Sequence, residues 1–209
     1  MKIMIIGATG TIGKAVAESL SDAHEIIRVA RHSGDYRVDI ASKPSIEKLF
    51  RDVGTVEAVI CAAGLAKYGP LIDLKDEDFA LGLTSKLMGQ VNLVRVGWDH
   101  VASGGSFTLT SGILSHSPEP GSAAISLVNA GLEGFVRAAA LSMPRGQRIN
   151  AVSPGWVKET LEAMGRDSRG APPARQVAQV YRQSLEGRHN GVILPARISG
   201  RMESPDWSI

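Results

Sequence analysis

The sequence predicts an α/β fold, a doubly wound parallel β-sheet flanked by helices, in a single domain spanning residues 1–209. Short apolar runs rich in β-branched residues alternate with segments of helical period, which is typical of strand–helix–strand units. The first apolar run leads directly into a glycine-rich turn, as at the start of many nucleotide-binding sheets. With 209 residues and 44% hydrophobic content, the chain can bury one sizeable core.

The glycine-rich turn follows the first predicted strand, residues 2–6, and opens a predicted helix over residues 11–22. Its glycines recur at a spacing of three, which lets the backbone approach a phosphate at the free N–H groups of a helix N-terminus. A turn that only joins strand to helix is the alternative. The motif predicts a Rossmann-like dinucleotide site, and the residues expected to bind the cofactor here are Gly7, Thr9, Gly10, Thr11, Ile12 and Gly13.

The end of the second predicted strand, residues 25–31, indicates which dinucleotide binds. In such folds a carboxylate at this place binds the ribose 2′-hydroxyl, whereas an arginine accommodates a 2′-phosphate. This strand ends at Arg31 and is followed by Ser33, with no carboxylate between them. The pair therefore favours NADP(H) over NAD(H), although an arginine that is merely exposed at a strand end is the alternative.

The rest of the chain continues the alternation. Residues 38–40 follow the second strand closely, whereas a parallel crossover usually needs about a dozen residues or more, so we expect an abbreviated sheet edge there. The ligand crevice of such a sheet lies beyond the carboxyl ends of its strands. Further strands are predicted at 38–40, 56–61, 106–110, 148–153 and 191–195, and further helices at 44–52, 79–101, 122–143, 156–165 and 173–186.

Composition excludes several classes of function. The formal net charge is +2, from 23 basic and 21 acidic residues without a basic run, so neither nucleic acid nor an anionic membrane is implied as a partner. A single cysteine, Cys61, excludes an internal disulfide, and no Cys/His cluster has metal-ligand spacing. No apolar run reaches the roughly 18 residues of a membrane span, and none resembles a signal peptide. We therefore expect a soluble, cytoplasmic protein that binds a small-molecule substrate and no metal.

The helix predicted at 122–143 carries only two charges, Glu133 and Arg137. A helix that is apolar nearly all round must be buried on more than one side. Together with the helix predicted at 79–101 it would expose a large apolar patch on a monomer. We expect a homodimer or homotetramer built through these two long helices, because a two-fold interface needs only one self-complementary surface.

Several motifs occur in the order found in the short-chain dehydrogenase/reductase family, which the chain resembles over nearly its whole length. They are the three loop glycines, Asp39–Ile40, which in the family contacts the adenine, Ala62–Ala63–Gly64 in place of an Asn-Ala-Gly turn, and residues 148–155 ending in Pro154–Gly155. The resemblance implies an NADP(H)-binding domain, commonly a dimer or tetramer. It also implies contacts to the nicotinamide from the backbone around Gly155 and Val157, followed by a threonine that here comes late, as Thr160.

The family's catalytic residues do not carry over. The family places Tyr and Lys four residues apart on the second long helix, where Lys lowers the pKa of Tyr so that the phenol can exchange a proton with the substrate. By alignment, Ile125 and Asn129 occupy these positions. The catalytic serine falls on Gly112, one residue after Ser111, and the family's helix asparagine aligns with Lys86. The chain thus resembles a divergent member that lacks the Tyr-x-x-x-Lys pair.

The Asn and Lys positions of the family have exchanged residue types, which defines the candidate catalytic residues. Lys86 and Asn129 could face each other across the cleft, where Lys86 would polarise a carbonyl or hold an anionic ligand. The alternative for Lys86 is a solvated helix residue. Ser111 is a candidate hydrogen-bond donor to substrate, and Tyr68 and His116, on loops bordering the crevice, are the local groups with suitable protons.

Two functions remain open on these grounds. The first is an NADP(H)-dependent oxidoreductase that acts on a carbonyl or alcohol with a rearranged catalytic site. The second is an NADP(H)-binding sensor or regulatory protein without turnover, which the residues at positions 125 and 129 suggest.

Overall fold

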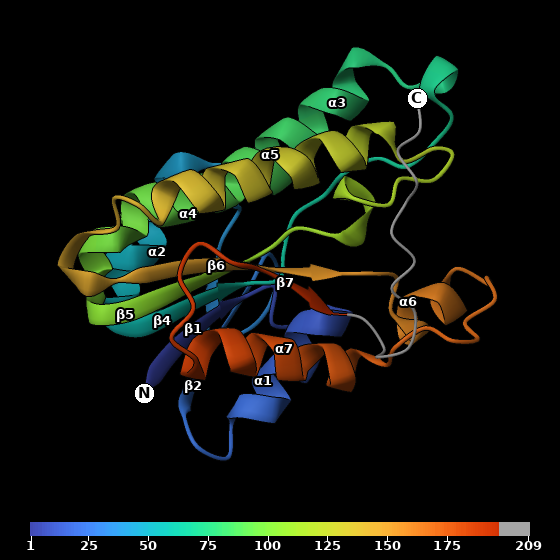
Figure 1. Cartoon of the computed structure of the whole chain (residues 1–209). Helices are drawn as coiled ribbons and strands as arrows, with labels where there is room; N and C mark the ends of the chain where they lie inside the picture. Colours follow the sequence, from blue (N-terminus) through green and yellow to red (C-terminus); the bar gives the residue numbers. More distant parts are fainter. Residues whose placement is uncertain (197–209) are drawn as a thin grey trace.

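The computed structural model describes residues 1–196, which form a seven-stranded parallel sheet covered by helices on both faces (Figure 1). The strand order is β3-β2-β1-β4-β5-β6-β7. This confirms the predicted α/β fold class. The strands are β1 Lys2–Ile6, β2 Glu25–Ala30, β3 Tyr36–Arg37, β4 Val56–Cys61, β5 Val101–Thr110, β6 Arg148–Pro154 and β7 Ile193–Ala196.

Helices α1 and α7 cover one face of the sheet, and α2, α4 and α5 cover the other (Figure 1). The α-helices are α1 Thr11–Leu20, α2 Lys43–Val53, α3 Asp76–Gly82, α4 Gly89–Gly97, α5 Ala123–Ala139, α6 Lys158–Ala163 and α7 Ala174–Glu186. Strand β1 shows why both faces need a cover. Its residues Met4 and Ile6 pack into the core on the α2/α4/α5 side, whereas Ile3 and Ile5 pack on the α1/α7 side.

The sheet edge at β3 is abbreviated, as expected, but the strand lies ahead of the predicted residues 38–40. Strand β3 has two residues and pairs Tyr36 with Val29 in parallel. The short connection is possible because Gly34 adopts φ +95° and Asp35 accepts a hydrogen bond from the Arg28 N–H at 2.8 Å. The chain therefore returns to the sheet within a tight turn, earlier than the sequence pattern indicated.

The helix predicted at 79–101 is interrupted and shifted toward the N-terminus. It begins at Asp76, where the Asp78 carboxylate accepts the Lys75 N–H at 3.0 Å and caps the first turn. A π-helical turn, Leu83–Met88, separates α3 from α4. A 3₁₀ turn, Trp98–His100, then ends the helical stretch, and β5 begins five residues before the predicted strand.

Within residues 1–196, no helix combines the length and the apolar character needed to cross a membrane.

Candidate active site

The glycine-rich loop between β1 and α1 forms a cradle that fits a dinucleotide phosphate. Gly7 has φ +85°, and a Cβ there would lie 2.7 Å from the Ala62 carbonyl oxygen. A Cβ on Gly13 would overlap the Gly7 carbonyl oxygen, so both positions require glycine. The N-cap of α1, Gly10, makes no side-chain capping bond. Among residues 1–196 the N–H groups of the first helical turn have no acceptor, so they are available to bind an anion.

Two cavities adjoin along the carboxyl edge of the sheet and share the wall Ala62–Ala63–Gly64. The first, of about 420 Å³, lies over the loop and is lined by Ile6, Gly7, Thr9, Gly10, Ala30, Arg31, Val38, Asp39, Ile40, Leu65 and Ser85 besides the shared wall. The second, of about 210 Å³, is lined by Ile12, Lys86, Thr110, Ser111, Gly112, Ile113, Leu114, Ile125, Asn129, Pro154, Gly155, Trp156, Val157 and Thr160 besides the same wall. Together they form one extended site along this edge.

Most of the residues expected to bind the cofactor line one cavity or the other. Three of them line neither: Gly13 is buried beneath the loop, while Thr11 and Ser33 are exposed. Arg31 lies at the rim of the larger cavity, 59% exposed, with its Nη2 atom 3.4 Å from the Asp39 carboxylate. A phosphate at this rim would compete with Asp39 for the Arg31 guanidinium.

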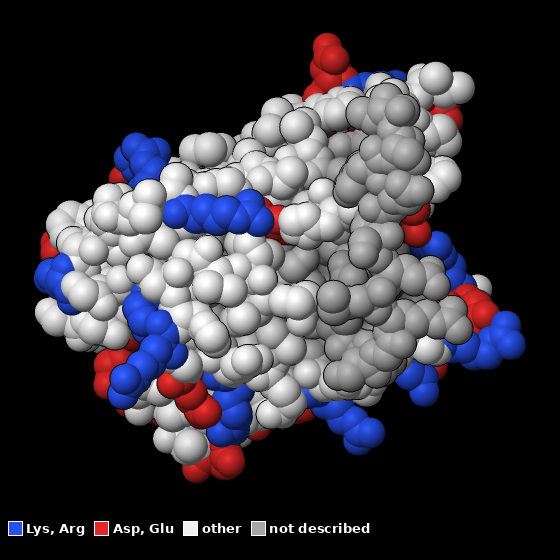
Figure 2. All heavy atoms as spheres, in the orientation of Figure 1, with Lys and Arg blue, Asp and Glu red and all other residues white. Residues whose placement is uncertain are grey.

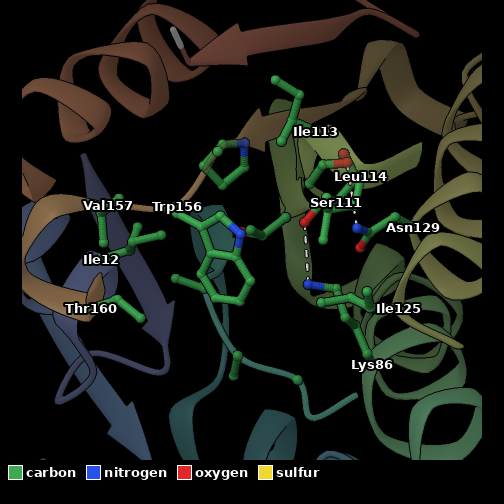
Figure 3. A pocket seen from close by; sticks show the side chains of 17 residues that line it. Ile12, Lys86, Ser111, Ile113, Leu114, Ile125, Asn129, Trp156, Val157 and Thr160 are labelled. Carbon is green, nitrogen blue, oxygen red and sulfur yellow. Dashed lines mark hydrogen bonds between the residues drawn. The ribbon is translucent and has the colours of Figure 1, made fainter. Parts of the chain in front are cut away.

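Lys86 points into the smaller cavity from the π-helical turn, as Figure 3 shows. Its ammonium donates a hydrogen bond to the Ser111 carbonyl oxygen at 3.1 Å. Gly64 has φ +141°, and a Cβ there would come within 2.9 Å of the Lys86 Cα and Cγ atoms. The Ala62–Gly64 turn therefore lies directly against the stem of Lys86 and limits its movement.

Gln90, one turn after Lys86, joins this helix to the end of β5. Its side-chain amide donates to the carbonyl oxygens of Lys86 and Thr110, at 3.1 Å and 3.0 Å, and accepts the Thr110 N–H at 2.8 Å. The Gln90 side chain is fully buried. It therefore holds the π-helical turn in a fixed position relative to the strand end that carries Ser111.

Burial lowers the pKa of Lys86 from 10.5 to about 8, and Cys61 acts in the opposite direction with a smaller effect. Within the described part of the chain, no carboxylate lines the smaller cavity. One N–H of the ammonium is used by Ser111, so the remaining hydrogens are available to a ligand in the cavity. The arrangement suits a carbonyl oxygen or an anion, and it keeps the proton transferable near neutral pH.

Asn129, on α5, lies on the same side of the cavity as Lys86 (Figure 3). It is 1% exposed, and its Nδ2 atom makes a long hydrogen bond of 3.4 Å to the Gly112 carbonyl oxygen. Its Oδ1 atom is buried and has no hydrogen-bond partner among residues 1–196. Ile125, one turn earlier, also lines the cavity. Lys86 and Asn129 thus line the same cavity.

Ser111 lines the cavity mainly through its backbone. Its side chain is buried and its hydroxyl donates to the Val152 carbonyl oxygen at 3.4 Å, whereas its own carbonyl oxygen accepts from Lys86. The structure therefore supports a role for Ser111 in holding Lys86. The expected donation from the Ser111 hydroxyl to substrate stays a prediction.

His116 lies outside the residues that line either cavity. Its Nε2 atom is 2.7 Å from the buried Glu133 carboxylate, and its side chain is 49% exposed. The same carboxylate accepts from the Ser115 hydroxyl at 2.6 Å and contacts Arg137 at 3.4 Å. This cluster ties the loop after β5 to α5, so the position of His116 supports an anchoring role better than a catalytic one.

Sequence reasoning missed Trp156, Ile113 and Leu114 as lining residues of the smaller cavity. It also set aside Thr160, which does line the cavity although it follows Pro154–Gly155 late. Trp156 directly follows the Pro-Gly pair at the end of β6, so its place after a strand of the sheet was a usable signal. The two apolar residues after Gly112 carry no chemical signature that separates them from core residues.

The order of the parallel sheet, the glycine cradle and the paired cavities define a dinucleotide-binding α/β protein with a substrate cavity beside the cofactor site. A family model described as enoyl-(acyl carrier protein) reductase matches residues 7–186. The chain belongs to the short-chain dehydrogenase/reductase family.

Curated relatives are reductases. The chain is 30% identical over 151 residues to a hydroxynaphthalene reductase of Aspergillus fumigatus, a match that covers 69% of this chain and 55% of that protein. The chain therefore spans only about half the length of that relative. It is 25% identical over 178 residues to a 3-oxoacyl-(acyl-carrier-protein) reductase of Mus musculus, with 75% of each chain covered.

Solved structures match the fold over nearly all of the chain. The protein lin1944 from Listeria innocua superposes with a TM-score of 0.90 at 41% identity, covering 93% of this chain and 98% of that one. A small-chain dehydrogenase in complex with NADPH superposes with a TM-score of 0.86 at 25% identity, covering 94% and 96%.

Proposed function

We propose that the chain is an NADP(H)-dependent oxidoreductase that interconverts a carbonyl compound and its alcohol, with Lys86 as the proton donor. One observation carries the proposal: the Lys86 ammonium lies in the smaller cavity, where no lining residue within the described range 1–196 is a carboxylate. Because this partly buried ammonium has no counter-ion among residues 1–196, it can bind an electron-rich group that enters the cavity. The adjoining cavity proposed for the cofactor supports a redox role for a group bound there.

The choice of NADP(H) rests on the cradle and on Arg31. The first-turn N–H groups of α1 suit the pyrophosphate, and Arg31 at the cavity rim suits a 2′-phosphate. The NADPH complex of the similar small-chain dehydrogenase supports the same cofactor here. When bound, NADPH supplies the hydride that reduces the carbonyl carbon.

The chain's own residues supply the proton. Lys86 donates a hydrogen bond to the carbonyl oxygen and transfers the proton to it as the C=O double bond is reduced, which leaves a neutral amine that is reprotonated from solvent. The carbonyl of Ser111 orients the ammonium, and Asn129, which is bonded to the Gly112 carbonyl oxygen, lines the cavity beside it. Apolar lining residues such as Ile113 and Leu114 exclude water.

The second candidate, an NADP(H)-binding protein without turnover, is favoured by Ile125. This side chain lines the cavity at the position where the family carries its tyrosine, and it has no proton to exchange. Such a protein would bind the cofactor without reducing any carbonyl, and the occupied state would act through a partner surface.

A panel of aldehydes, ketones and alcohols followed by NADPH absorbance separates the two functions. Wild type should reduce at least one carbonyl compound, and Lys86→Met should lose about a hundredfold or more in kcat, as removal of a proton-transfer group does. Lys48→Met, the same change at an exposed position on α2, should behave as wild type. Turnover unchanged in Lys86→Met would exclude the proton-donor role, and cofactor binding without turnover in wild type would favour the second candidate.

We also propose a homodimer or homotetramer built through α4 and α5. Apolar side chains on or next to these helices remain exposed, among them Leu127 on α5 at 50% and Met88, which directly precedes α4, at 38%. A second copy of the same face would cover them.

A further inference from the structure

Trp156 forms part of the wall of the smaller cavity and belongs to a cluster of four side chains, which we call the wall cluster: Tyr68, Glu119, Trp156 and Arg166. They come from four connecting segments, after β4, after β5, after β6 and after α6. In Figure 3 the Trp156 ring stands in the middle of the cavity view, with Lys86 and Asn129 to one side and Ile12 and Val157 to the other. The position of the indole therefore decides how much room the cavity offers.

Three contacts hold the indole. Its Nε1–H donates to a Glu119 carboxylate oxygen at 3.0 Å, and the same oxygen accepts from the Tyr68 hydroxyl at 3.2 Å. The Tyr68 ring meets the indole edge-on at a centroid distance of 6.0 Å. The Arg166 guanidinium lies over the indole at 5.5 Å. Glu119 is therefore the group that joins Tyr68 to Trp156.

The surrounding backbone supports this arrangement. The single hydrogen of the Tyr68 hydroxyl is shared between Glu119 and the Pro120 carbonyl oxygen, which lies closer, at 2.7 Å, and the Gly69 N–H donates to the Gly121 carbonyl oxygen at 2.9 Å. Gly121 has φ +88°, and a Cβ there would come within 3.1 Å of the Tyr68 ring. Burial first, and then the Glu119 carboxylate, raise the pKa of Tyr68, so the phenol remains a donor. The wall is thus built to keep the indole in one place.

The small volume of this cavity makes the position of the wall cluster important for which substrates fit. Its volume is about 210 Å³, below the roughly 300 Å³ at which pockets for drug-sized ligands begin. The reactive end of the cofactor has to share that space with the substrate. We infer that Trp156 is a specificity-determining residue that limits substrates to compact carbonyl compounds, with Glu119 as its positioning residue. The inference rests on the proposed oxidoreductase function of the same cavity.

Two aldehydes that differ by one ring, benzaldehyde and biphenyl-4-carbaldehyde, test the inference. Wild type should prefer benzaldehyde in kcat/KM, and Trp156→Ala should shift the ratio toward the larger aldehyde by about tenfold or more. Glu119→Ala should shift it in the same direction by less. Glu119→Gln should keep the wild-type ratio, because its side-chain oxygen can accept both hydrogen bonds. Arg169→Ala, in the same loop as Arg166 but paired with Asp167, serves as the control.

Calorimetric binding of both aldehydes to the protein–NADP⁺ complex gives a readout that needs no turnover. A shift in binding preference in Trp156→Ala without any turnover would refute the proposed function and leave the wall inference standing. Turnover with an unchanged ratio would refute the wall inference alone. If neither aldehyde binds to wild type or to any variant, the wall inference is also refuted, because Trp156 would then not line a site that binds carbonyl compounds.

Discussion

The charged ammonium of Lys86 lies in a partly buried position, and this lowers the free energy of unfolding. A pKa of about 8 in the folded protein, against 10.5 for a free side chain, corresponds to a cost of at most about 3 kcal/mol for the charged form. Because the folded-state pKa is the lower one, the cost is fully present below about pH 8 and disappears as pH rises from there toward 10.5.

Replacing Lys86 with Met should therefore stabilise the protein at neutral pH while it removes activity. Urea unfolding should show a higher free energy of unfolding for Lys86→Met at pH 7, by about 1 to 3 kcal/mol, and a smaller difference at about pH 10. Lys48→Met, at an exposed position, should change little. If Lys86→Met is less stable than wild type at pH 7, the Lys86 ammonium stabilises the fold, and this prediction is wrong.

Arg31 is expected to set the preference for NADPH over NADH. Charge-assisted hydrogen bonds from its guanidinium to a 2′-phosphate are worth about 1.5 to 3 kcal/mol. Calorimetry on Arg31→Ala should therefore show the preference for NADPH shrinking by about tenfold or more. Arg37→Ala, on neighbouring β3 and outside the lining of the cavity, is the matched control. Equal losses of affinity for both cofactors in Arg31→Ala would rule out the 2′-phosphate contact.

At the scale of elements, Gln90 connects the π-helical turn to β5. Gln90→Leu would leave the buried Thr110 N–H and carbonyl without their side-chain partner, and each such loss costs about 1 to 3 kcal/mol. We expect a lower free energy of unfolding by about 2 kcal/mol or more in urea, together with reduced kcat from a displaced Lys86. Asn92→Leu, on the outer side of the same helix, should stay within about 0.5 kcal/mol of wild type. A Gln90→Leu variant as stable as wild type would show that this link contributes little.

The elements differ in how far the sequence could predict them. The β1–loop–α1 unit was predicted closely because periodicity and glycine spacing are both local signals. The π-helical turn was not predicted, because one wider turn leaves the apolar pattern of period 3.6 residues unchanged. Strand β3 was displaced because its pairing depends on the turn at Gly34, a tertiary constraint.

The candidate site divides in the same way. Motif order predicted that residues 86 and 129 lie at one site, and the fold brings both to one cavity; the exchange of residue types between them stays a prediction. The link from Glu119 to Tyr68 and Trp156 was not readable, because it joins residues 51 and 37 positions away along the chain. Contacts between distant loops leave no periodic signal in a single sequence.

At the scale of the whole molecule, the face formed by α4 and α5 is expected to bind a second copy. The two helices run side by side over the sheet, and the surface over α5 is largely uncharged (Figures 1 and 2). Gly134 is exposed on α5, and a Cβ there would meet no atom within 4 Å. Gly134→Glu therefore fits the monomer and places a charge on the proposed interface.

Light scattering at micromolar concentration tests this assembly. Wild type should have at least twice the mass of one 22.1 kDa chain, and both Gly134→Glu and Ala138→Glu should dissociate to folded monomers. Lys48→Glu, on α2, should remain assembled. A wild-type mass near 22.1 kDa would exclude the proposed oligomer.

The role of Lys86 as proton donor is tested most directly by the pH dependence of kcat/KM for NADPH-dependent reduction of a compact aldehyde. With a pKa of about 8, the ammonium keeps its proton below that pH and loses it above. The profile should be level below about pH 8 and then fall about tenfold per pH unit. Lys86→Arg keeps the positive charge, but arginine does not release its proton in this pH range. The variant should therefore lose most activity, and its pH profile should show no break near pH 8. A wild-type profile that stays level to about pH 10, or the same break in Lys86→Arg, would contradict the assignment.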